Sequence, residues 1–214
     1  VYFKKDLLRL IEGKLDVLRG RFTTPNAKLI WLLLIATIPV CVSGLLLKDF
    51  VSTGGRSFLV LGTTSIVFGL LLGVSDGRFV SRPGGIGQIT RKDALIFGLM
   101  QALAIIPGTS RSGITMTAGR FLGFERTTSA RFSMLMAIPV IVLIGLASTL
   151  DVVDAPINWQ NAWQDMLLGV GLAFISALAA IHLLMTLVTR MGFWPFVVYR
   201  VALGVLLLGL YFSA

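Results

Sequence analysis

Residues 107–113 read Pro-Gly-Thr-Ser-Arg-Ser-Gly and interrupt an otherwise apolar part of the chain. Gly108 and Gly113 allow backbone angles that other residues avoid, so successive amide hydrogens can turn toward one point and form a nest for an anion. Arg111 adds a guanidinium group, whose planar fork matches the oxygens of a phosphate. The loop therefore predicts a site for a phosphate or diphosphate.

Hydroxyl side chains surround this arginine in the sequence. They are Thr109, Ser110, Ser112 and Thr115. A helix is expected to begin just after the loop, so the positive end of its dipole would point at the same place. A simpler interpretation is that Arg111 extends to the membrane interface and that the loop is only a turn. An arginine near the middle of a membrane costs at least about 2.5 kcal/mol and usually marks a functional site, so we favour the anion site.

The composition places this loop in a membrane protein. Of the 214 residues, 56% are hydrophobic and 14% are charged, whereas soluble domains carry about 25% charged residues. The single cysteine and single histidine exclude a disulfide framework and a cysteine-rich or histidine-rich metal site. We attribute the formal net charge of +9 to the positive-inside bias of membrane proteins rather than to nucleic-acid binding.

Five apolar stretches are long enough to cross a bilayer as helices. They are residues 29–47, 57–75, 132–150, 166–189 and 191–214. A sixth stretch, 94–106, would be about 20 Å long as a helix, too short for a hydrocarbon core of about 30 Å. The loop and a second short segment, 114–124, follow it, so we expect residues 94–124 to form a re-entrant hairpin that carries the site. The predicted fold class is all-α: a polytopic integral membrane protein with about five spanning helices and one re-entrant helix hairpin.

The distribution of basic residues supports the hairpin. If the hairpin enters and leaves on one side, 14 Lys and Arg residues fall on the side of the N-terminus, and only Lys48 and Arg56 fall on the other. The loop 151–165, with three acids and no bases, then lies on that other side. The positive-inside rule places the N-terminus in the cytoplasm. Residues 1–28 are then a basic cytoplasmic segment that lies against anionic headgroups, and residues 82–87 are a flexible connector.

The run from Pro107 to Thr115 resembles the second signature motif of the bacterial undecaprenyl-pyrophosphate phosphatases, also known as bacitracin-resistance proteins. The similarity covers essentially the whole chain and includes Gln101, Arg131-Phe132-Ser133, Ala137-Ile138-Pro139 and Tyr199-Arg200. It implies hydrolysis of undecaprenyl diphosphate to undecaprenyl phosphate, which recycles the lipid carrier for peptidoglycan synthesis and confers bacitracin resistance. It also implies a multi-pass protein of the bacterial cytoplasmic (inner) membrane, with the site facing the periplasmic or outer side.

The same resemblance implies which residues carry the reaction. It assigns Arg111, Ser110 and Thr115 to catalysis, and Gly108, Thr109, Ser112, Gly113 and Gln101 to substrate binding. It further implies a divalent cation, Mg or Ca, although no ligand set for it is visible in the sequence. The expected partners are a polyprenyl diphosphate lipid and the bilayer, with no nucleic acid. A homodimer is one possible oligomeric state.

The sequence departs from the family pattern at its start. The family's first repeat, with its glutamate-rich motif, is not present, and neither Glu12 nor Glu125 lies where an acid would meet Arg111. We therefore interpret residues 1–214 as a single, N-terminally truncated membrane domain, the second half of an inverted repeat. We expect the natural protein to continue before Val1 with one span and one re-entrant hairpin. A transporter or flippase for an anionic lipid or solute is the alternative function, since broken helices also hold substrate in transporters.

Two further polar residues lie within predicted spans. His182 is better explained by an interhelical hydrogen bond than by catalysis. Arg200 is expected to make an interior contact, such as one with a backbone carbonyl, and a lipid phosphate is the alternative partner.

Overall fold

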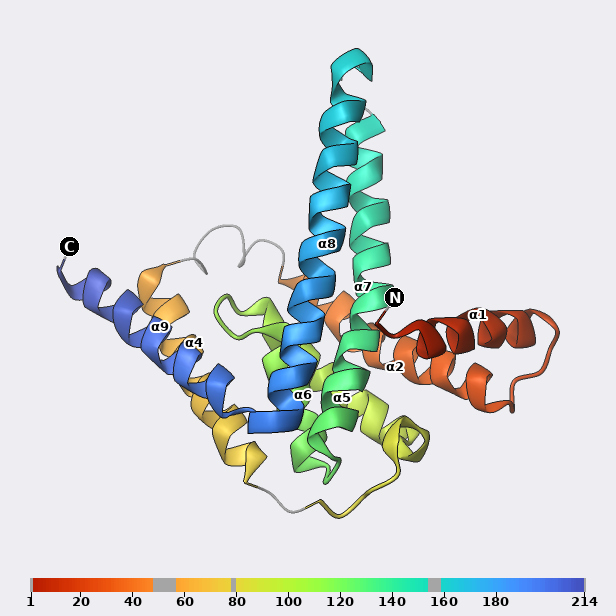
Figure 1. Ribbon diagram of the computed structural model, residues 1–214, viewed down its shortest axis with the longest axis horizontal. Helices are drawn as coiled ribbons and strands as arrows, with labels where there is room; N and C mark the ends of the chain where they lie inside the picture. Colours follow the sequence, from red (N-terminus) through yellow and green to blue (C-terminus); the bar gives the residue numbers. More distant parts are fainter. Residues whose placement is uncertain (1, 48–56, 78–79, 154–158, 214) are drawn as a thin grey trace.

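The computed structural model describes residues 2–47, 57–77, 80–153 and 159–213, without the side chains of residues 150–162. These parts of the chain are helical and contain no strand, apart from an isolated bridge between Arg82 and Phe124. The helices are α1 (Lys4–Leu18), α2 (Pro25–Leu46), α4 (Phe58–Asp76), α5 (Arg91–Ala102), α6 (Arg111–Phe121), α7 (Arg126–Val153), α8 (Trp159–Met191) and α9 (Trp194–Ser213), with short 3-10 helices η1 (Gly85–Gln88) and η2 (Leu103–Ile105) (Figure 1).

Five helices are long and apolar enough to cross a membrane, namely α2, α4, α7, α8 and α9. They coincide with the five predicted stretches, which confirms an all-α polytopic protein. The boundaries differ where α8 meets α9, because α8 continues to Met191 and α9 begins at Trp194. Gly192, with a φ of 70°, turns the chain between them, since glycine adopts this left-handed conformation readily.

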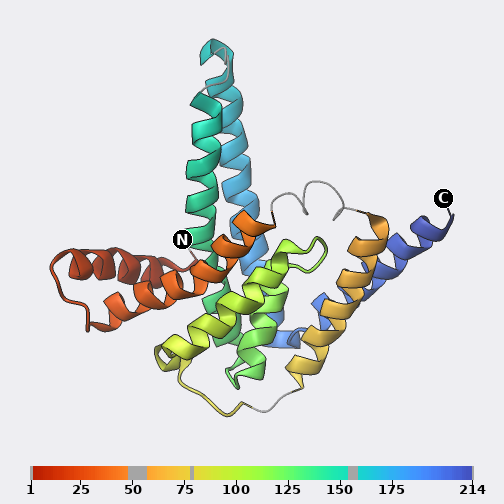
Figure 2. The ribbon, with the colours of Figure 1, turned by 180° about the vertical axis from the view of Figure 1, so that it is seen from behind.

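The predicted hairpin consists of α5 and α6, with 12 and 11 residues. At 1.5 Å per residue these helices are about 18 and 16 Å long, so neither can cross a core of about 30 Å. The start of α5 and the end of α6, which are the ends away from the loop 107–113, lie at the same end of the molecule. The connection before α5 is bound there to the connection after α6, because the amides of Ser81 and Arg82 both donate to the carbonyl of Gly123 at 3.1 Å. The hairpin therefore enters and leaves at one end of the molecule, as predicted. Figure 2 shows α5 and α6 side by side, between α2 and the pair formed by α4 and α9.

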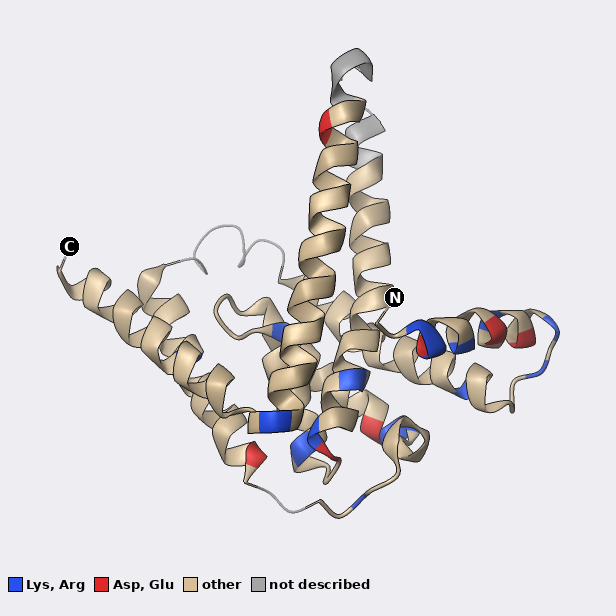
Figure 3. Cartoon of the chain, in the orientation of Figure 1, with Lys and Arg blue, Asp and Glu red and all other residues tan. Residues whose placement is uncertain are grey.

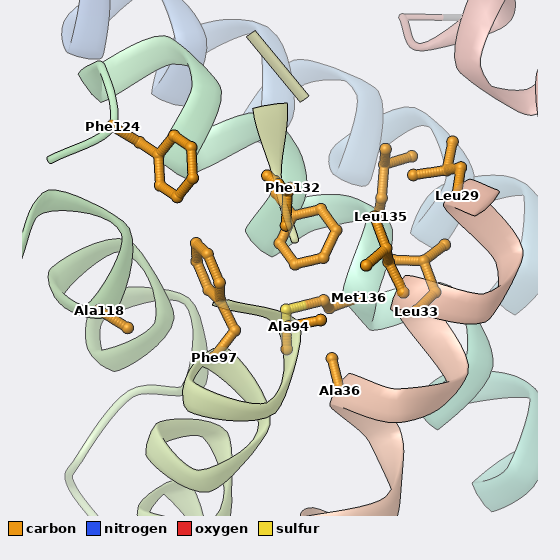
Figure 4. Close-up of a cluster of buried hydrophobic side chains, with 12 residues drawn as sticks. Leu29, Leu33, Ala36, Ala94, Phe97, Ala118, Phe124, Phe132, Leu135 and Met136 are labelled. Carbon is orange, nitrogen blue, oxygen red and sulfur yellow. The ribbon is translucent and has the colours of Figure 1, made fainter. Parts of the chain in front are cut away.

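A cluster of apolar side chains fixes the hairpin against α2 and α7 (Figure 4). The ring of Phe97 on α5 meets that of Phe132 on α7 edge-on, with centroids 4.8 Å apart, and lies 6.4 Å from the ring of Phe124. All three rings are fully buried. Gly98 brings α5 close to α2, because a Cβ at this position would lie 2.6 Å from the carbonyl oxygen of Ala36. Packing against neighbouring helices thus holds the hairpin in place.

Basic residues gather at the open end of the hairpin (Figure 3). We call this end the base; it comprises α1, the first turns of α2, α5 and α7, the last turn of α4, and the connections before α5 and after α6. Three aspartate–arginine pairs, each with two hydrogen bonds, join its elements. They are Asp6–Arg131, Asp76–Arg126 and Asp93–Arg82. Lys48 and Arg56, the two bases expected at the opposite end, and residues 154–158 of the acidic loop lie outside the described residues.

The connector 82–87 is more ordered than the sequence indicated. Residues Gly85–Gln88 form a 3-10 helix, and Arg82 is bound to Asp93 at 2.7 and 2.8 Å. Burial opposes ionisation of Asp93, but the hydrogen bonds from Arg82 and Thr90 outweigh it and lower the pKa of this carboxyl. The hydrogen bond to Asp93 raises the pKa of Arg82 in turn. The expectation of a flexible connector was therefore wrong at Arg82, which fixes the first turn of α5.

Candidate active site

The tip of the hairpin, residues 107–113, is held on one side by hydroxyl groups of α4. Thr64 donates to the carbonyl of Pro107 at 2.7 Å, and Ser65 donates to that of Gly108 at 3.3 Å. Gly108 has a φ of 87°, and a Cβ there would collide with the Thr64 hydroxyl. Glycine is required at this position for its conformation and for the close approach of α4.

Arg200 of α9 holds the same loop from a second helix. Its guanidinium donates to the carbonyl of Thr109 at 2.7 Å and to that of Gly108 at 2.5 Å. The side chain is buried, with 8% of the residue surface exposed. The expected contact between Arg200 and a backbone carbonyl is confirmed. The sequence did not indicate that both carbonyls belong to the tip, since α9 lies far along the chain.

These tethers leave amide hydrogens at the tip available. The carbonyls of residues 107–109 are turned toward α4 and α9, and α6 begins directly afterwards at Arg111. Among the described residues, the amides of residues 110–112 have no hydrogen-bond acceptor. The first amides of a helix lack partners within the helix and form a ready site for an anion. The free amides fit the anion site that the loop sequence predicts, and the site itself stays a prediction.

Ser110 occupies an unusual backbone conformation at this point. Its φ of 65° is the one positive value at a residue other than glycine in the described chain. Its hydroxyl accepts a hydrogen bond from the amide of Gly113 at 3.3 Å and so caps α6. A non-glycine residue in this region stores strain and is often found at functional sites. Because the hydroxyl accepts from the helix, its own hydrogen stays available to a ligand.

Arg111 is the central side chain of the predicted site. Its guanidinium donates to the amide oxygen of Gln101 over 3.5 Å, a long hydrogen bond. Gln101 is fully buried and donates to the carbonyl of Ala36 on α2 at 3.3 Å, which orients it toward Arg111. No carboxylate pairs with Arg111 in the parts of the chain that the structure describes. The arginine therefore retains donors for an anion.

A cavity of about 500 Å³ lies against the tip. Its polar part is formed by Ser65, Ser110, Ser112 and Arg200 together with the backbone of Gly108 and Gly113. The rest of the lining is mainly apolar and comes from α4, α6, α8 and α9, including Leu61, Leu72, Met116, Leu184, Phe196, Leu203 and Leu207. A cavity with one polar end and apolar walls suits an amphiphilic ligand.

The predicted site residues divide into three groups. Gly108, Ser110, Ser112 and Gly113 line the cavity. Arg111 and Gln101 contact each other on the side of α2. The other two, Thr109 and Thr115, are fully buried. The hydroxyl of Thr109 has no hydrogen-bond partner among the described residues. The hydroxyl of Thr115 lies 2.6 Å from that of Ser133 and donates to the carbonyl of Arg111 at 2.9 Å. Thr115 thus joins α6 to α7.

The remaining sequence candidates lie away from the tip. His182 is exposed, and its ring meets that of Tyr2 edge-on with centroids 5.8 Å apart. Its side chain makes no hydrogen bond with another described residue, so the expected interhelical bond is not found there. Glu12 accepts a hydrogen bond from Asn26 at the base. No group of three or more His, Cys, Asp or Glu residues lies together in the described chain. The hydroxyls, amides and guanidinium of the tip do not by themselves form a ligand set for the implied divalent cation.

Comparison with known proteins identifies the family to which the chain belongs. The model of the family described as "Bacitracin resistance protein BacA" matches residues 1–206. The chain belongs to this family. Three curated relatives are each named undecaprenyl-diphosphatase. One from Hahella chejuensis is 44% identical over 95% of this chain and 75% of its own length. One from Teredinibacter turnerae is 45% identical over 97% and 77%, and one from Alteromonas mediterranea is 40% identical over 100% and 79%.

Membership in the bacitracin-resistance family explains why a membrane protein carries this loop. The matched region includes the whole re-entrant hairpin, together with the tethers from α4 and α9. The resemblance inferred from the motif around Arg111 is thereby confirmed. The family gives the phosphate chemistry, and the structure adds which helices hold the loop.

Proposed function

We propose that the hairpin tip holds the diphosphate of undecaprenyl diphosphate while its terminal phosphate is removed. The activity is that of an undecaprenyl-diphosphatase, in which water adds across the phosphoanhydride to give undecaprenyl phosphate and inorganic phosphate. This returns the lipid carrier to peptidoglycan synthesis and accounts for the bacitracin resistance that describes the family. Arg111 carries the proposal, because it is half-buried at the start of α6 and has no carboxylate partner in the described chain.

Each residue of the tip has a defined role in this proposal. Arg111 binds phosphate oxygens through charge-assisted hydrogen bonds, and the free amides of residues 110–112 share the negative charge. Ser110 and Ser112 line the cavity, and their hydroxyls donate to the diphosphate from that side. Gln101 positions the guanidinium, and Thr115 positions the first turn of α6 through Ser133. The apolar walls of the cavity accommodate the first part of the prenyl chain. The tip thus orients the diphosphate and stabilises the charge that develops during hydrolysis.

Phosphate release from a prenyl diphosphate by the intact protein in detergent micelles tests this role. Loss of a buried arginine–phosphate contact costs about 3–5 kcal/mol, so Arg111→Ala should lower the rate by about two to four decades. Arg111→Lys keeps the charge but loses the planar fork, and should also be strongly impaired. His182→Ala is the control and should be nearly silent, because His182 is exposed and lies on another helix. Activity of Arg111→Ala within a factor of three of the parent would remove Arg111 from the mechanism.

We further propose that the base faces the cytoplasm and that the tip opens toward the outer side of the membrane. The concentration of Lys and Arg at the base supports this orientation. In a Cys41→Ala background, a cysteine in place of Gln164 on α8 should react with an impermeant maleimide in intact cells. Lys14→Cys on α1 should react only after permeabilisation. The reverse pattern would contradict the orientation and leave the role of Arg111 untouched.

A further inference from the structure

A second cavity, of about 600 Å³, lies at the base, at the opposite end of the hairpin from Arg111. It is enclosed by α1, the first turns of α2, the start of α7 and the glycine-rich segment 84–87. Its charged and polar lining consists of Asp6, Arg9, Thr23, Asn26, Lys28 and Arg131. Three cations and a single carboxylate in one cavity give it an excess of positive charge. The phosphatase chemistry uses none of these residues.

The one carboxylate of this cavity is already engaged. Both oxygens of Asp6 accept hydrogen bonds from Arg131 at 2.6 Å, and Arg9 lies 3.8 Å from one of them. Asp6 is 1% exposed, whereas its arginine partner is partly accessible. Arg131 uses Nε and Nη2 in this pair, so Nη1 has no hydrogen-bond acceptor among the described residues. The pair with Arg131 therefore occupies both oxygens of Asp6, and Nη1 of Arg131 stays available to a ligand in the cavity.

Lys28 provides the second available donor. Its ammonium group contacts only the carbonyl of Gly87, at 3.4 Å, and forms no ion pair in the described chain. An ammonium group carries three hydrogens, so this single long contact leaves most of its capacity unused. Together with Arg9, which is largely exposed, the cavity presents cationic donors from three different helices. An anion with several oxygens, such as a phosphate, matches this arrangement.

The neighbouring surface indicates where such an anion comes from. Helix α1 lines the cavity with Asp6 and Arg9 and exposes a set of large apolar side chains on its other face. They are Leu7, Leu8, Ile11, Leu15 and Leu18. A helix with an exposed apolar face and basic residues lies in the interface between lipid and water, with its charges at the depth of the headgroups. Because Asp6 and Arg9 of this helix line the cavity, we expect the cavity to lie at the depth of the phospholipid phosphates.

We propose that the cavity at the base is a second phosphate site, which binds the phosphate of an anionic ligand through Lys28, Arg9 and Arg131. A phospholipid headgroup is the source that the position of α1 favours, and soluble phosphate is the other source of the same chemistry. A bound phosphate would link α1, α2 and α7, and so brace the end of the molecule from which the hairpin rises. The site is independent of the function of the tip.

Two substitutions test the site without disturbing the pair of Asp6 and Arg131. Lys28→Gln removes one cation, with Lys14→Gln, an exposed cation on α1 outside the cavity, as the control of equal charge. Gly87 lines the cavity, has an ordinary φ, and has open space where a Cβ would be added. Gly87→Glu should therefore place a negative charge in the cavity, and Gly87→Gln is its neutral control.

The first measurement is native mass spectrometry, which compares how much phosphatidylglycerol and how much phosphatidylcholine the protein retains. The second is the melting temperature in lipid-free detergent, with and without inorganic phosphate. The parent should retain phosphatidylglycerol preferentially, and Lys28→Gln should lower that affinity about tenfold, as expected for one charge-assisted hydrogen bond. Gly87→Glu should abolish it, and both controls should behave as the parent. A rise in melting temperature with phosphate alone, lost in Lys28→Gln, would also support the site and identify the source as soluble. Absence of both effects, or equal losses in Lys14→Gln, would overturn the proposal.

Discussion

The two ends of the re-entrant hairpin satisfy their arginines in different ways. At the base, each of three arginines makes two hydrogen bonds with an aspartate. At the tip, Arg200 donates to backbone carbonyls, and Arg111 meets only the amide oxygen of Gln101 in the described chain. An arginine paired with a carboxylate joins helices together, whereas one left with neutral neighbours is available to an anionic ligand.

The presence or absence of a carboxylate partner affects stability because these arginines are partly or fully removed from water. Taking a cation out of water is costly, and a carboxylate partner offsets part of that cost. Arg111 is half-buried without a carboxylate partner in the described chain, so we expect it to add less to the stability of the unliganded protein than the paired arginines do. Neutralising one partner of an aspartate–arginine pair at the base should therefore weaken the fold, and removing Arg111 should not.

The largest loss of stability is expected for Asp76→Asn. Asp76 accepts two hydrogen bonds from Arg126 and one from the amide of Phe193, and lies 3.9 Å from Arg120, which is 3% exposed. Breaking a buried ion pair by neutralising one partner costs about 3–5 kcal/mol. Thermal unfolding in detergent should show this loss, while Asp165→Asn, at an exposed position of α8, should stay close to the parent. Equal behaviour of the two variants would show that the base is not held by its ion pairs.

Arg200→Met should have a smaller effect on stability and a clear effect on activity. The substitution leaves the carbonyl of Thr109 without a donor, at about 1–3 kcal/mol for a buried acceptor, and leaves that of Gly108 with the hydroxyl of Ser65 alone. Since Arg200 positions the loop without needing to touch substrate, Arg200→Lys should recover part of both properties. Melting temperature and phosphate release, measured on the same preparations, check this. Full activity of Arg200→Met would mean that α4 alone holds the tip.

The sequence predicted the spans and the hairpin because hydropathy and segment length determine both. It also indicated Arg111, since an arginine in a glycine-rich and serine-rich loop between two short helices has few structural explanations. The tethers to the tip were not predictable, because Thr64 and Arg200 approach the loop only through tertiary packing. For the same reason, the inward orientation of Thr115 toward Ser133 was not visible. Its assignment to catalysis stays a prediction, and the contacts observed favour a positioning role.

Arg82 shows the converse limit. In the sequence it precedes a proline and three glycines, a pattern typical of a flexible connector. Its partner Asp93 lies on α5, where it also completes a capping box with Thr90. The turn propensity of this segment correctly indicates that its glycines are conformationally free. It cannot indicate the contact between Arg82 and Asp93, which forms only when the connector packs against the first turn of α5.

We expect Arg111 to contribute to ligand binding and not to the stability of the fold. Thermal unfolding of Arg111→Met and of the parent, with and without pyrophosphate as a water-soluble diphosphate, tests it most directly. Without ligand, Arg111→Met should melt at the same temperature as the parent or above it. Pyrophosphate at about 100 times its Kd should stabilise the parent by about 2.7 kcal/mol and leave the variant nearly unchanged. A ligand-free Arg111→Met that melts as low as Asp76→Asn, or one that pyrophosphate stabilises as much as the parent, would contradict the account.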